Sequence, residues 1–360
     1  MGRVKLIPIV IAGGRGTRFW PLSRRKKPKQ LLDLISKKPL IRETYERLAP
    51  VSGKKEVYIS TSKDLVEPIK KILPEIPEKN YLVEPEPRDT APGIGLALAM
   101  VSRELKKASP EPVLAFLPSD HYIKKPAEFR KVLKKAGEIA YKKNLIVTIG
   151  IKPTFPSTSY GYIQPKEPIS GYKDAYFVKR FKEKPDLRRA KRYVSMGFFW
   201  NAGIFIATPS LLWELFERYQ PTMAEVLKKI STAPDARLVS TINREFPKLT
   251  KISFDYAIME QAKEVGVVAG EFGWSDVGGY YALYQLLGGD GDKNISFGRL
   301  VERKSRGNFV RAEKLVALVG VSELAVIESE DAILVMNLKE EAELKNLIAQ
   351  LEKSGLKKYL

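Results

Sequence analysis

The alternation of apolar and polar stretches along the chain predicts buried strands separated by amphipathic helices. Residues 4–12 form an apolar run that ends at Gly13-Gly14, which is typical of a strand covered on both faces of a parallel sheet. Further strands are expected at residues 57–61, 81–83, 113–117 and 145–151. Residues 90–107 have helical spacing of apolar positions, with Thr90 as the expected cap and Pro92 in the first turn.

This order of elements predicts an α/β fold, a doubly wound and mostly parallel sheet of the Rossmann-like kind. Such sheets bind ligands at the carboxyl ends of their strands. After about residue 290 the pattern changes to short apolar runs between Gly, Asp and Asn turns, at residues 309–310, 315–319, 324–327 and 333–336. We therefore expect a large domain over residues 1–290 and a small β-rich domain over residues 291–360 that ends in a helix at residues 340–351.

Composition restricts the chemistry. The chain has no cysteine and a single histidine, His121, so disulfides, thiolate metal sites and cysteine nucleophiles are excluded. Any metal must be bound by oxygen ligands or by His121, to which we assign no chemical role. No run of 18 apolar residues exists, and the first residues do not resemble a signal peptide, so we expect a cytoplasmic protein with no membrane partner.

A formal charge of +20 raises the possibility of a nucleic-acid partner. However, most lysine pairs fall in amphipathic helical stretches, where a solvated face explains them. Examples are the pairs at residues 106–107, 134–135, 142–143 and 228–229. We expect no nucleic acid among the partners.

The first candidate site is the glycine-rich stretch that follows the first strand. It consists of Ala12, Gly13, Gly14, Arg15, Gly16, Thr17 and Arg18. Glycines after a buried strand let backbone N–H groups face an anion and let a phosphate approach closely, and the arginines add positive charge. By itself the stretch is equally compatible with a tight turn. It is neither a Walker loop nor a dinucleotide fingerprint, because the spacing differs.

The second candidate site is Pro28-Lys29-Gln30, which follows a basic run at residues 24–27. Such a run resembles a nuclear localisation or nucleic-acid patch, and short matches of this kind are mostly accidental. Beside a glycine-rich loop at a strand end, we interpret Lys29 as a lysine that binds polyphosphate.

Together the two stretches resemble the signature of the mannose-1-phosphate guanylyltransferase family, G-G-x-G-T-R-x-W-P-L-S-R-x-x-x-P-K-Q, at every fixed position. The resemblance continues through further blocks at residues 84–92, 117–121, 153–163, 181–185, 200–203 and 272–278. The sequence departs from the family where Asp89 replaces a common Asn and Ser159 a common Gly, which affects substrate details rather than reaction type. The longer bifunctional relatives carry an additional isomerase domain, for which we expect no room in this chain.

The resemblance implies a role for particular residues. The implied catalytic residues are Arg18 and Lys29, and the implied metal ligands are Asp120 and Asp276. Besides residues 12–17, the implied nucleotide-binding residues are Glu84, Arg88, Thr90, Ala91, Pro92 and Ser119. The implied sugar-phosphate-binding residues are Tyr160, Gly161, Glu183, Lys184, Asn201 and Gly203.

The residues themselves leave simpler interpretations open. Asp276 could be a helix N-cap. Glu183 and Lys184 could belong to a solvated strand end, and Asn201 and Gly203 to an ordinary turn with a packing glycine. The neighbouring aromatic side chains are expected in the core rather than in a stacking platform; they are Phe198, Phe199, Trp200 and Phe205.

The activity implied by the resemblance joins GTP to mannose 1-phosphate, giving GDP-mannose and pyrophosphate, with Mg²⁺ held by two aspartates. The preference for guanine rests on the resemblance alone. The first alternative is another sugar-1-phosphate nucleotidylyltransferase with a different base or sugar. A non-catalytic sugar-nucleotide or nucleic-acid-binding protein is the second alternative, and a homodimer formed through the small β-rich domain stays open.

Overall fold

The computed structural model describes residues 4–14, 16–105 and 110–360, which fold into two compact units. The first unit comprises the chain up to Gly13 together with Thr44–Ser119 and Ile123–Trp274. The second comprises Gly14–Glu43, Asp120–Tyr122 and Ser275–Leu360. The units therefore do not coincide with a single boundary near residue 290, because two earlier segments pack with the C-terminal residues.

A nine-stranded mixed sheet forms the centre of the first unit, in the order β3-β2-β1-β4-β9-β6-β10-β8-β7. Its strands are β1 (Leu6–Ile11), β2 (Tyr58–Ser62), β3 (Tyr81–Glu84), β4 (Val113–Pro118), β6 (Ile146–Ile151), β7 (Tyr162–Pro168), β8 (Ala175–Lys182), β9 (Phe199–Ala207) and β10 (Val265–Ala269). The pairs among β1 to β4 are parallel, whereas β9 is antiparallel to both β4 and β6. The strands predicted from apolar runs are all present, with ends that differ by at most two residues.

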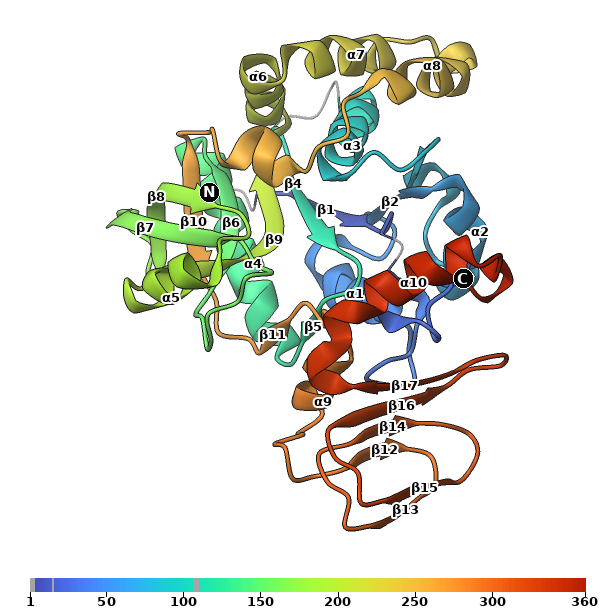
Figure 1. Cartoon of the computed structure of the whole chain (residues 1–360). Coiled ribbons are helices and arrows are strands. Elements are labelled where there is room, and N and C mark those ends of the chain that lie inside the picture. Colours follow the sequence, from blue (N-terminus) through green and yellow to red (C-terminus); the bar gives the residue numbers. More distant parts are fainter. Residues whose placement is uncertain (1–3, 15, 106–109) are drawn as a thin grey trace. The chain divides into compact units, whose positions relative to one another are not determined.

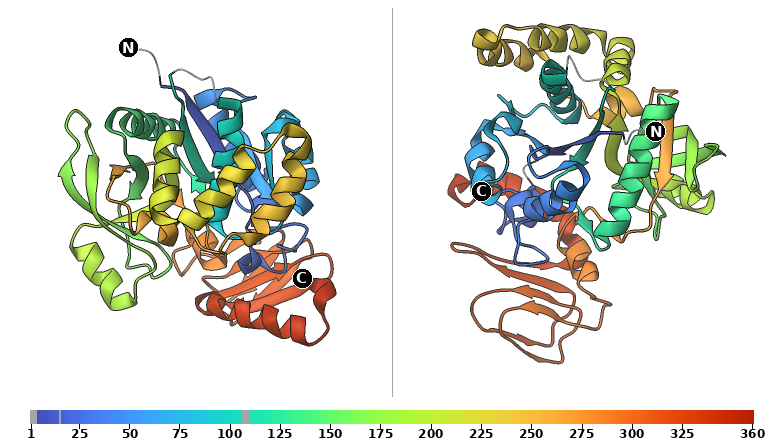
Figure 2. Two further views of the ribbon diagram at one scale, coloured as in Figure 1. Left: turned by 90° about the horizontal axis from the view of Figure 1, so that it is seen from above. Right: turned by 180° about the vertical axis from the view of Figure 1, so that it is seen from behind.

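Side chains alternate between the two faces of this sheet. Ile7 and Ile9 of β1 belong to the core beneath α3 (Thr90–Leu105), α6 (Pro209–Tyr219) and α7 (Pro221–Ser231). Leu6 packs instead against Gly137 of α4 (Pro126–Lys143), on the opposite face. Figures 1 and 2 show helices over both faces of the sheet. The other helices of this unit are α2 (Val66–Ile72), α5 (Leu187–Ser195), α8 (Leu238–Glu245) and most of α1 (Leu40–Ser52).

The helix predicted over residues 90–107 begins at Thr90 and ends at Leu105, and residues 106 and 107 lie outside the described residues. The expectation that Thr90 caps this helix is wrong. Its hydroxyl accepts a hydrogen bond from the Phe254 N–H at 2.8 Å, while the Thr90 N–H donates to the Asp89 carboxylate at 2.7 Å. The hydroxyl therefore connects the start of α3 to the start of the π-helical turn Asp255–Met259 instead of satisfying a free N–H of α3.

The order of strands changes direction between β1 and β4, which lie side by side although β2 and β3 come between them in the chain. Sheets of this kind bind ligands at such a point. The Ser119 N–H donates to the Ile11 carbonyl at 3.1 Å, so the carboxyl ends of β1 and β4 are adjacent. The chain enters the second unit directly after each of these two ends, at residues 14 and 120.

The second unit contains the predicted β-rich region. A four-stranded sheet has the order β12-β14-β16-β17, and a two-stranded sheet pairs β13 with β15 (Figure 1). The strands are β12 (Ile295–Phe297), β13 (Leu300–Arg303), β14 (Phe309–Arg311), β15 (Val316–Val319), β16 (Leu324–Glu328) and β17 (Ile333–Asn337). The final helix, α10 (Leu344–Lys353), begins four residues later than predicted, because the segment Leu338–Glu343 forms a 3₁₀ turn.

Within this unit, the segment after Gly14 packs against α9 (Tyr280–Leu286) in one core. Phe19 and Tyr280 are fully buried and meet edge to face, with ring centroids 5.1 Å apart. The Tyr280 hydroxyl donates to the backbone carbonyls of Phe19 at 2.9 Å and of Trp20 at 3.3 Å. One buried hydroxyl thus fixes the backbone that follows the glycine-rich stretch.

We predict that Tyr280→Phe lowers the free energy of unfolding by about 1–3 kcal/mol, because two buried carbonyls lose their donor. Tyr281→Phe on the same helix is the matched control, since Tyr281 is 37% exposed. Urea unfolding of both variants measures the difference. Equal stabilities would contradict a structural role for the Tyr280 hydroxyl.

Candidate functional site

A cavity of about 300 Å³ in the second unit brings together six of the predicted site residues. These are Gly16, Thr17, Arg18, Lys29, Asp120 and Asp276. The cavity is completed by Phe19, His121 and Gly278. Residues from three distant parts of the sequence therefore line one cavity, and it contains both predicted cationic side chains and both predicted carboxylates.

Lys29 is the centre of this cavity. Its ammonium donates to Asp120 Oδ2 at 2.8 Å and to the backbone carbonyl of Asp276 at 2.5 Å. The Lys29 residue is only 7% exposed, and a buried ammonium is costly unless charged or polar acceptors surround it. One positive charge therefore contacts both aspartate residues, Asp120 through its carboxylate and Asp276 through its backbone carbonyl.

Gly16 makes this position of Lys29 possible. Its φ of 56° is in the left-handed region, and any Cβ at this position would collide with the Cβ of Lys29. Gln30 Nε2 donates to the Gly14 carbonyl at 3.0 Å and so fixes the same loop from the other side. The glycine-rich stretch and the Pro-Lys-Gln segment are thus two halves of one structure. Arg15, predicted to bind nucleotide, lies outside the described residues.

The two cationic side chains of the cavity, Lys29 and Arg18, differ in whether they already bind an anionic group of the protein. Burial would raise the pKa of Asp120, but the Lys29 ammonium and His121 outweigh it and hold that pKa below its ordinary value. Lys29 is thereby engaged with an anionic carboxylate. Arg18 is exposed at the cavity, and within the described ranges it makes no ion pair. The guanidinium of Arg18 is available to an anionic ligand.

The side chains of the cavity could supply only some of the ligands of a hard divalent cation. Asp120 and Asp276 supply two carboxylates, and no cluster of three or more His, Cys, Asp or Glu side chains that could hold a metal occurs among the residues that the structure describes. Mg²⁺ is commonly bound by one or two carboxylates, with water and substrate phosphate completing the octahedron. The donor set therefore suits an ion that binds together with a phosphate substrate.

The alternative that Asp276 caps a helix is wrong. Helix α9 begins at Tyr280, and the residue at its N-cap position is Gly279, with no side-chain cap. Asp276 instead lies in the loop before the helix, with its carboxylate beside Gly278.

The remaining predicted nucleotide-binding residues belong to the first unit. Ala12 and Ser119 lie at the adjacent ends of β1 and β4, and Glu84 is the last residue of β3. Ala91 and Pro92 are buried in the first turn of α3. Arg88 is held by the Glu86 carboxylate and by the Leu249 carbonyl at 2.8 Å, so its guanidinium is already hydrogen-bonded within the protein.

The predicted sugar-phosphate residues also form one group in the first unit. Asn201 lies at its centre: Asn201 Oδ1 accepts from the Thr148 hydroxyl at 2.9 Å and from the Gly203 N–H at 3.1 Å. Its Nδ2 donates to Asp255 Oδ1 at 2.9 Å. The Asn201 amide is thereby fixed in one orientation, which an ordinary turn residue would not require.

Glu183 occupies the space that Gly161 leaves, because a Cβ on Gly161 would collide with the Glu183 carboxylate. Lys184 Nζ donates to Glu183 Oε1 at 2.8 Å. Tyr160 packs edge to face on Trp200, with ring centroids 4.9 Å apart, and Trp200 is almost fully buried, as expected for the core. The group combines carboxylate acceptors, one ammonium and an aromatic wall, a set of donors and acceptors that suits a polar sugar phosphate.

Asp255 was not predicted from the sequence. It starts a short π-helical turn, Asp255–Met259, and reaches the Asn201 amide from 54 residues away in the chain. Burial, together with the nearby Glu183 carboxylate, raises the pKa of Asp255 to about 7. Local sequence pattern offers no signal for such a residue, because only the tertiary fold brings it to the group.

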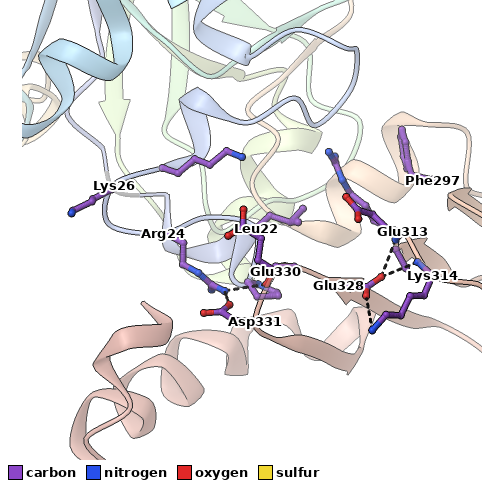
Figure 3. Close-up of a pocket in the computed structure, with 14 residues that line it drawn as sticks. Leu22, Arg24, Lys26, Phe297, Glu313, Lys314, Glu328, Glu330 and Asp331 are labelled. Carbon is purple, nitrogen blue, oxygen red and sulfur yellow. Dashed lines mark hydrogen bonds and ion pairs between the residues drawn. The ribbon is translucent and has the colours of Figure 1, made fainter. Parts of the chain in front are cut away.

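A second and larger cavity in the second unit, of about 780 Å³, contains none of the predicted site residues. Figure 3 shows two of its charged side chains, Arg24 and Glu328, bonded to neighbouring groups of the cavity. Arg24 donates to Asp331 at 2.6 Å, and Glu328 accepts from the backbone of Glu313 and Lys314. The charges of this cavity largely neutralise each other, so we do not assign it the reaction.

The fold is that of a nucleotidyl transferase. Residues 7–291 match the profile of the nucleotidyl transferase family, and residues 298–351 match that of the MannoseP isomerase/GMP-like beta-helix domain. Among the helices that the structure describes, none is both long and apolar enough to cross a membrane.

Similarity to individual proteins shows which family of nucleotidyl transferases the chain belongs to. A mannose-1-phosphate guanylyltransferase of Escherichia coli K12 is 34% identical over 363 residues, covering 99% of this chain and 75% of the relative. A xanthan biosynthesis protein of Xanthomonas campestris is 32% identical over 97% of this chain and 74% of its own length. A crystal structure from Thermus thermophilus, described as a mannose-1-phosphate geranyltransferase, is 34% identical with a TM-score of 0.88, covering 97% of this chain and 99% of that one. This chain belongs to the mannose-1-phosphate guanylyltransferase family.

The site also allows a prediction on pH. Burial raises the pKa of Glu84 from 4.5 to about 7, so between these values the folded protein holds a proton that the unfolded chain has released. Stability is therefore lost as pH rises through this window. We predict that Glu84→Gln gains stability relative to the wild type between pH 4.5 and pH 8, by on the order of 3 kcal/mol.

Urea unfolding at several pH values measures this change. Glu225→Gln, on an exposed position of α7, is the control and should show no such trend. A pH-independent difference between Glu84→Gln and the wild type would show that Glu84 ionises normally.

Proposed function

We propose that this protein transfers a guanylyl group from GTP to mannose 1-phosphate, giving GDP-mannose and pyrophosphate. The observation that carries the proposal is the cavity in which Lys29 lies between Asp120 and Asp276, beside the exposed Arg18. Membership of the family and the names of its relatives support the choice of substrates.

The reaction needs no general base. The second pKa of a phosphate monoester is about 6, so the phosphate of mannose 1-phosphate is already largely a dianion at neutral pH. One of its oxygens attacks the α-phosphorus of GTP in line, the bond from the α-phosphorus to the bridging oxygen breaks, and pyrophosphate leaves with the electron pair. Catalysis then consists of positioning and charge stabilisation, which a protein with one histidine and no cysteine can provide.

Residues of each unit suit a part of this work. In the second unit, Arg18 and Lys29 stabilise the negative charge that develops on pyrophosphate, and the backbone N–H groups of the glycine-rich loop bind the phosphates. In the first unit, the Glu183 carboxylate accepts hydrogen bonds from the sugar hydroxyls and the Asn201 amide N–H donates to one, while Lys184 neutralises the sugar phosphate. The fixed Asn201 amide orients the sugar without moving during the reaction.

Asp120 and Asp276 would hold Mg²⁺ when it is bound. The ion would supply positive charge to the sugar phosphate and the α-phosphate and so reduce their repulsion. Lys29 contributes from the protein side by keeping the Asp120 carboxylate anionic and oriented in the cavity.

The arrangement of the first unit supports the expected fold class, a doubly wound and mostly parallel Rossmann-like sheet. Helices cover both of its faces, and the β3-β2-β1-β4 half is fully parallel. The lysines of its helices support the absence of a nucleic-acid partner, because several pair with acidic residues of the same surface, such as Lys142 with Glu138 and Lys228 with Glu217. Exposed ion pairs of this kind are typical of a solvated face.

We predict that Arg18→Ala and Lys29→Ala each lower kcat by on the order of 10² or more, because charge on the leaving group loses its stabilisation. Lys37→Ala, at an exposed position of the same unit, serves as control. Steady-state pyrophosphate release gives kcat, and circular dichroism verifies the fold. Near-normal turnover in both variants would remove these residues from the mechanism.

A substrate panel tests the reaction itself. Pyrophosphate release is measured for GTP, ATP, UTP and dTTP, each with mannose 1-phosphate and with glucose 1-phosphate, in the presence of Mg²⁺. We predict the highest kcat/KM for GTP with mannose 1-phosphate and loss of activity on addition of EDTA. A higher kcat/KM for any other pair would refute the proposed substrates.

A further inference from the structure

The Asp276 carboxylate is carried by a short loop whose backbone is strained. Val277, the next residue, is β-branched and has a φ of 48°, in the left-handed region that such residues rarely adopt. The loop ends at Gly279, directly before α9. A strained backbone persists only where the surrounding structure holds it in place. The position of Asp276 therefore requires groups that fix this loop.

One such group comes from the C-terminal part of the chain. Glu341 Oε2 accepts a hydrogen bond from the Tyr281 N–H, in the first turn of α9, at 3.0 Å. The first N–H groups of a helix have no partner within the helix, and Gly279, at the N-cap position, has no side chain to supply one. Glu341 therefore caps α9 from 60 residues further along the chain, at a helix end that favours a carboxylate.

The two glycines before α9 leave space for two carboxylates. A Cβ on Gly278 would lie 3.1 Å from Asp276 Oδ2, and a Cβ on Gly279 would collide with the Glu341 carboxylate. Burial raises the pKa of Glu341, and the charges of Arg18 and Asp276 also act on it. The Glu341 carboxylate thus lies within electrostatic reach of two residues that line the cavity of about 300 Å³.

The segment that carries Glu341 is itself anchored. Leu338 and Leu344, on either side of Glu341, are buried in the same core as Val277 and Tyr280. The hydrogen bond from Glu341 therefore links two segments that are packed in one core. A contact of this kind can hold the start of α9 in a fixed position.

We propose that Glu341 is a positioning residue of the metal site: by fixing the start of α9, it fixes the loop that carries Asp276. The proposal deepens the proposed function, because it assumes that Asp276 binds the divalent cation. It gives the small C-terminal domain a part in the reaction, through a carboxylate that acts on Asp276 and not on the substrate.

The test measures the binding of Mn²⁺, in place of Mg²⁺, to the full-length protein with GDP-mannose, by electron paramagnetic resonance. We expect Glu341→Ala to raise the Kd of Mn²⁺ by about 10- to 100-fold, the usual effect of removing a group that orients a metal ligand. Glu341→Gln retains an acceptor for the Tyr281 N–H and should recover most of the affinity. Glu340→Ala, at the exposed neighbouring position, is the control and should bind Mn²⁺ like the wild type.

Gly279→Ala tests the same contact from the other side. The extended backbone of Gly279, with a φ of −178°, can accept an alanine, but the new Cβ would displace the Glu341 carboxylate. We expect a similar rise in the Kd of Mn²⁺, and no further rise when Gly279→Ala is added to Glu341→Ala, because both changes break one contact. Gly279→Ala keeps the proposal falsifiable even where Glu341→Ala does not fold.

A structural role alone would lower the melting temperature of Glu341→Ala and leave the Kd of Mn²⁺ unchanged, which would overturn the proposal. An equal loss of affinity in Glu341→Gln and Glu341→Ala would also overturn it, because the loss would then follow the charge and not the hydrogen bond. If the wild type itself binds no Mn²⁺ with GDP-mannose, the metal site of the proposed function fails instead, which is a distinguishable result.

Discussion

The central constraint on this molecule is the accommodation of one buried positive charge. The Lys29 ammonium needs anionic and polar acceptors, and it finds them in the carboxylate of Asp120 and the carbonyl of Asp276. The position of the lysine in turn requires a glycine at residue 16, because any side chain there would collide with it. The glycine-rich loop, the lysine and the two aspartates therefore form a single electrostatic unit, although Gly16 and Asp276 are 260 residues apart in the chain.

The sheet explains how such distant residues come to be neighbours. In the first unit, β1 and β4 lie side by side, and the chain leaves their adjacent carboxyl ends to form the loop after Gly13 and the segment at Asp120. Glu84 ends a third strand at the same edge of the sheet. Parallel pairing thus positions the predicted nucleotide-binding residues through the direction of the strands, and Asn201 organises a separate group of the predicted sugar-phosphate-binding side chains in the first unit.

Much of this could be predicted from the sequence, because the strongest features are local. Apolar runs predicted the positions of the strands. The glycine-rich stretch and Pro28-Lys29-Gln30 showed the resemblance to the family, and this resemblance predicted the residues of the cavity. Features that depend on tertiary contacts could not be predicted: the Thr90 hydroxyl bonds the remote Phe254 N–H instead of capping its helix, and Asp255 reaches Asn201 from another part of the chain. The burial of the Glu84 carboxyl could not be predicted either, since burial and ion-pair partners are properties of the folded protein.

The proposed mechanism depends most directly on the two aspartates binding one cation at the phosphates. Crystals of the protein grown with GDP-mannose and Mn²⁺, which scatters anomalously, locate that cation without reference to activity. We predict an anomalous peak within bonding distance of the carboxylates of both Asp120 and Asp276 and of a phosphate oxygen. An anomalous peak at another position, or carboxylates that point away from the nucleotide, would contradict the proposed mechanism.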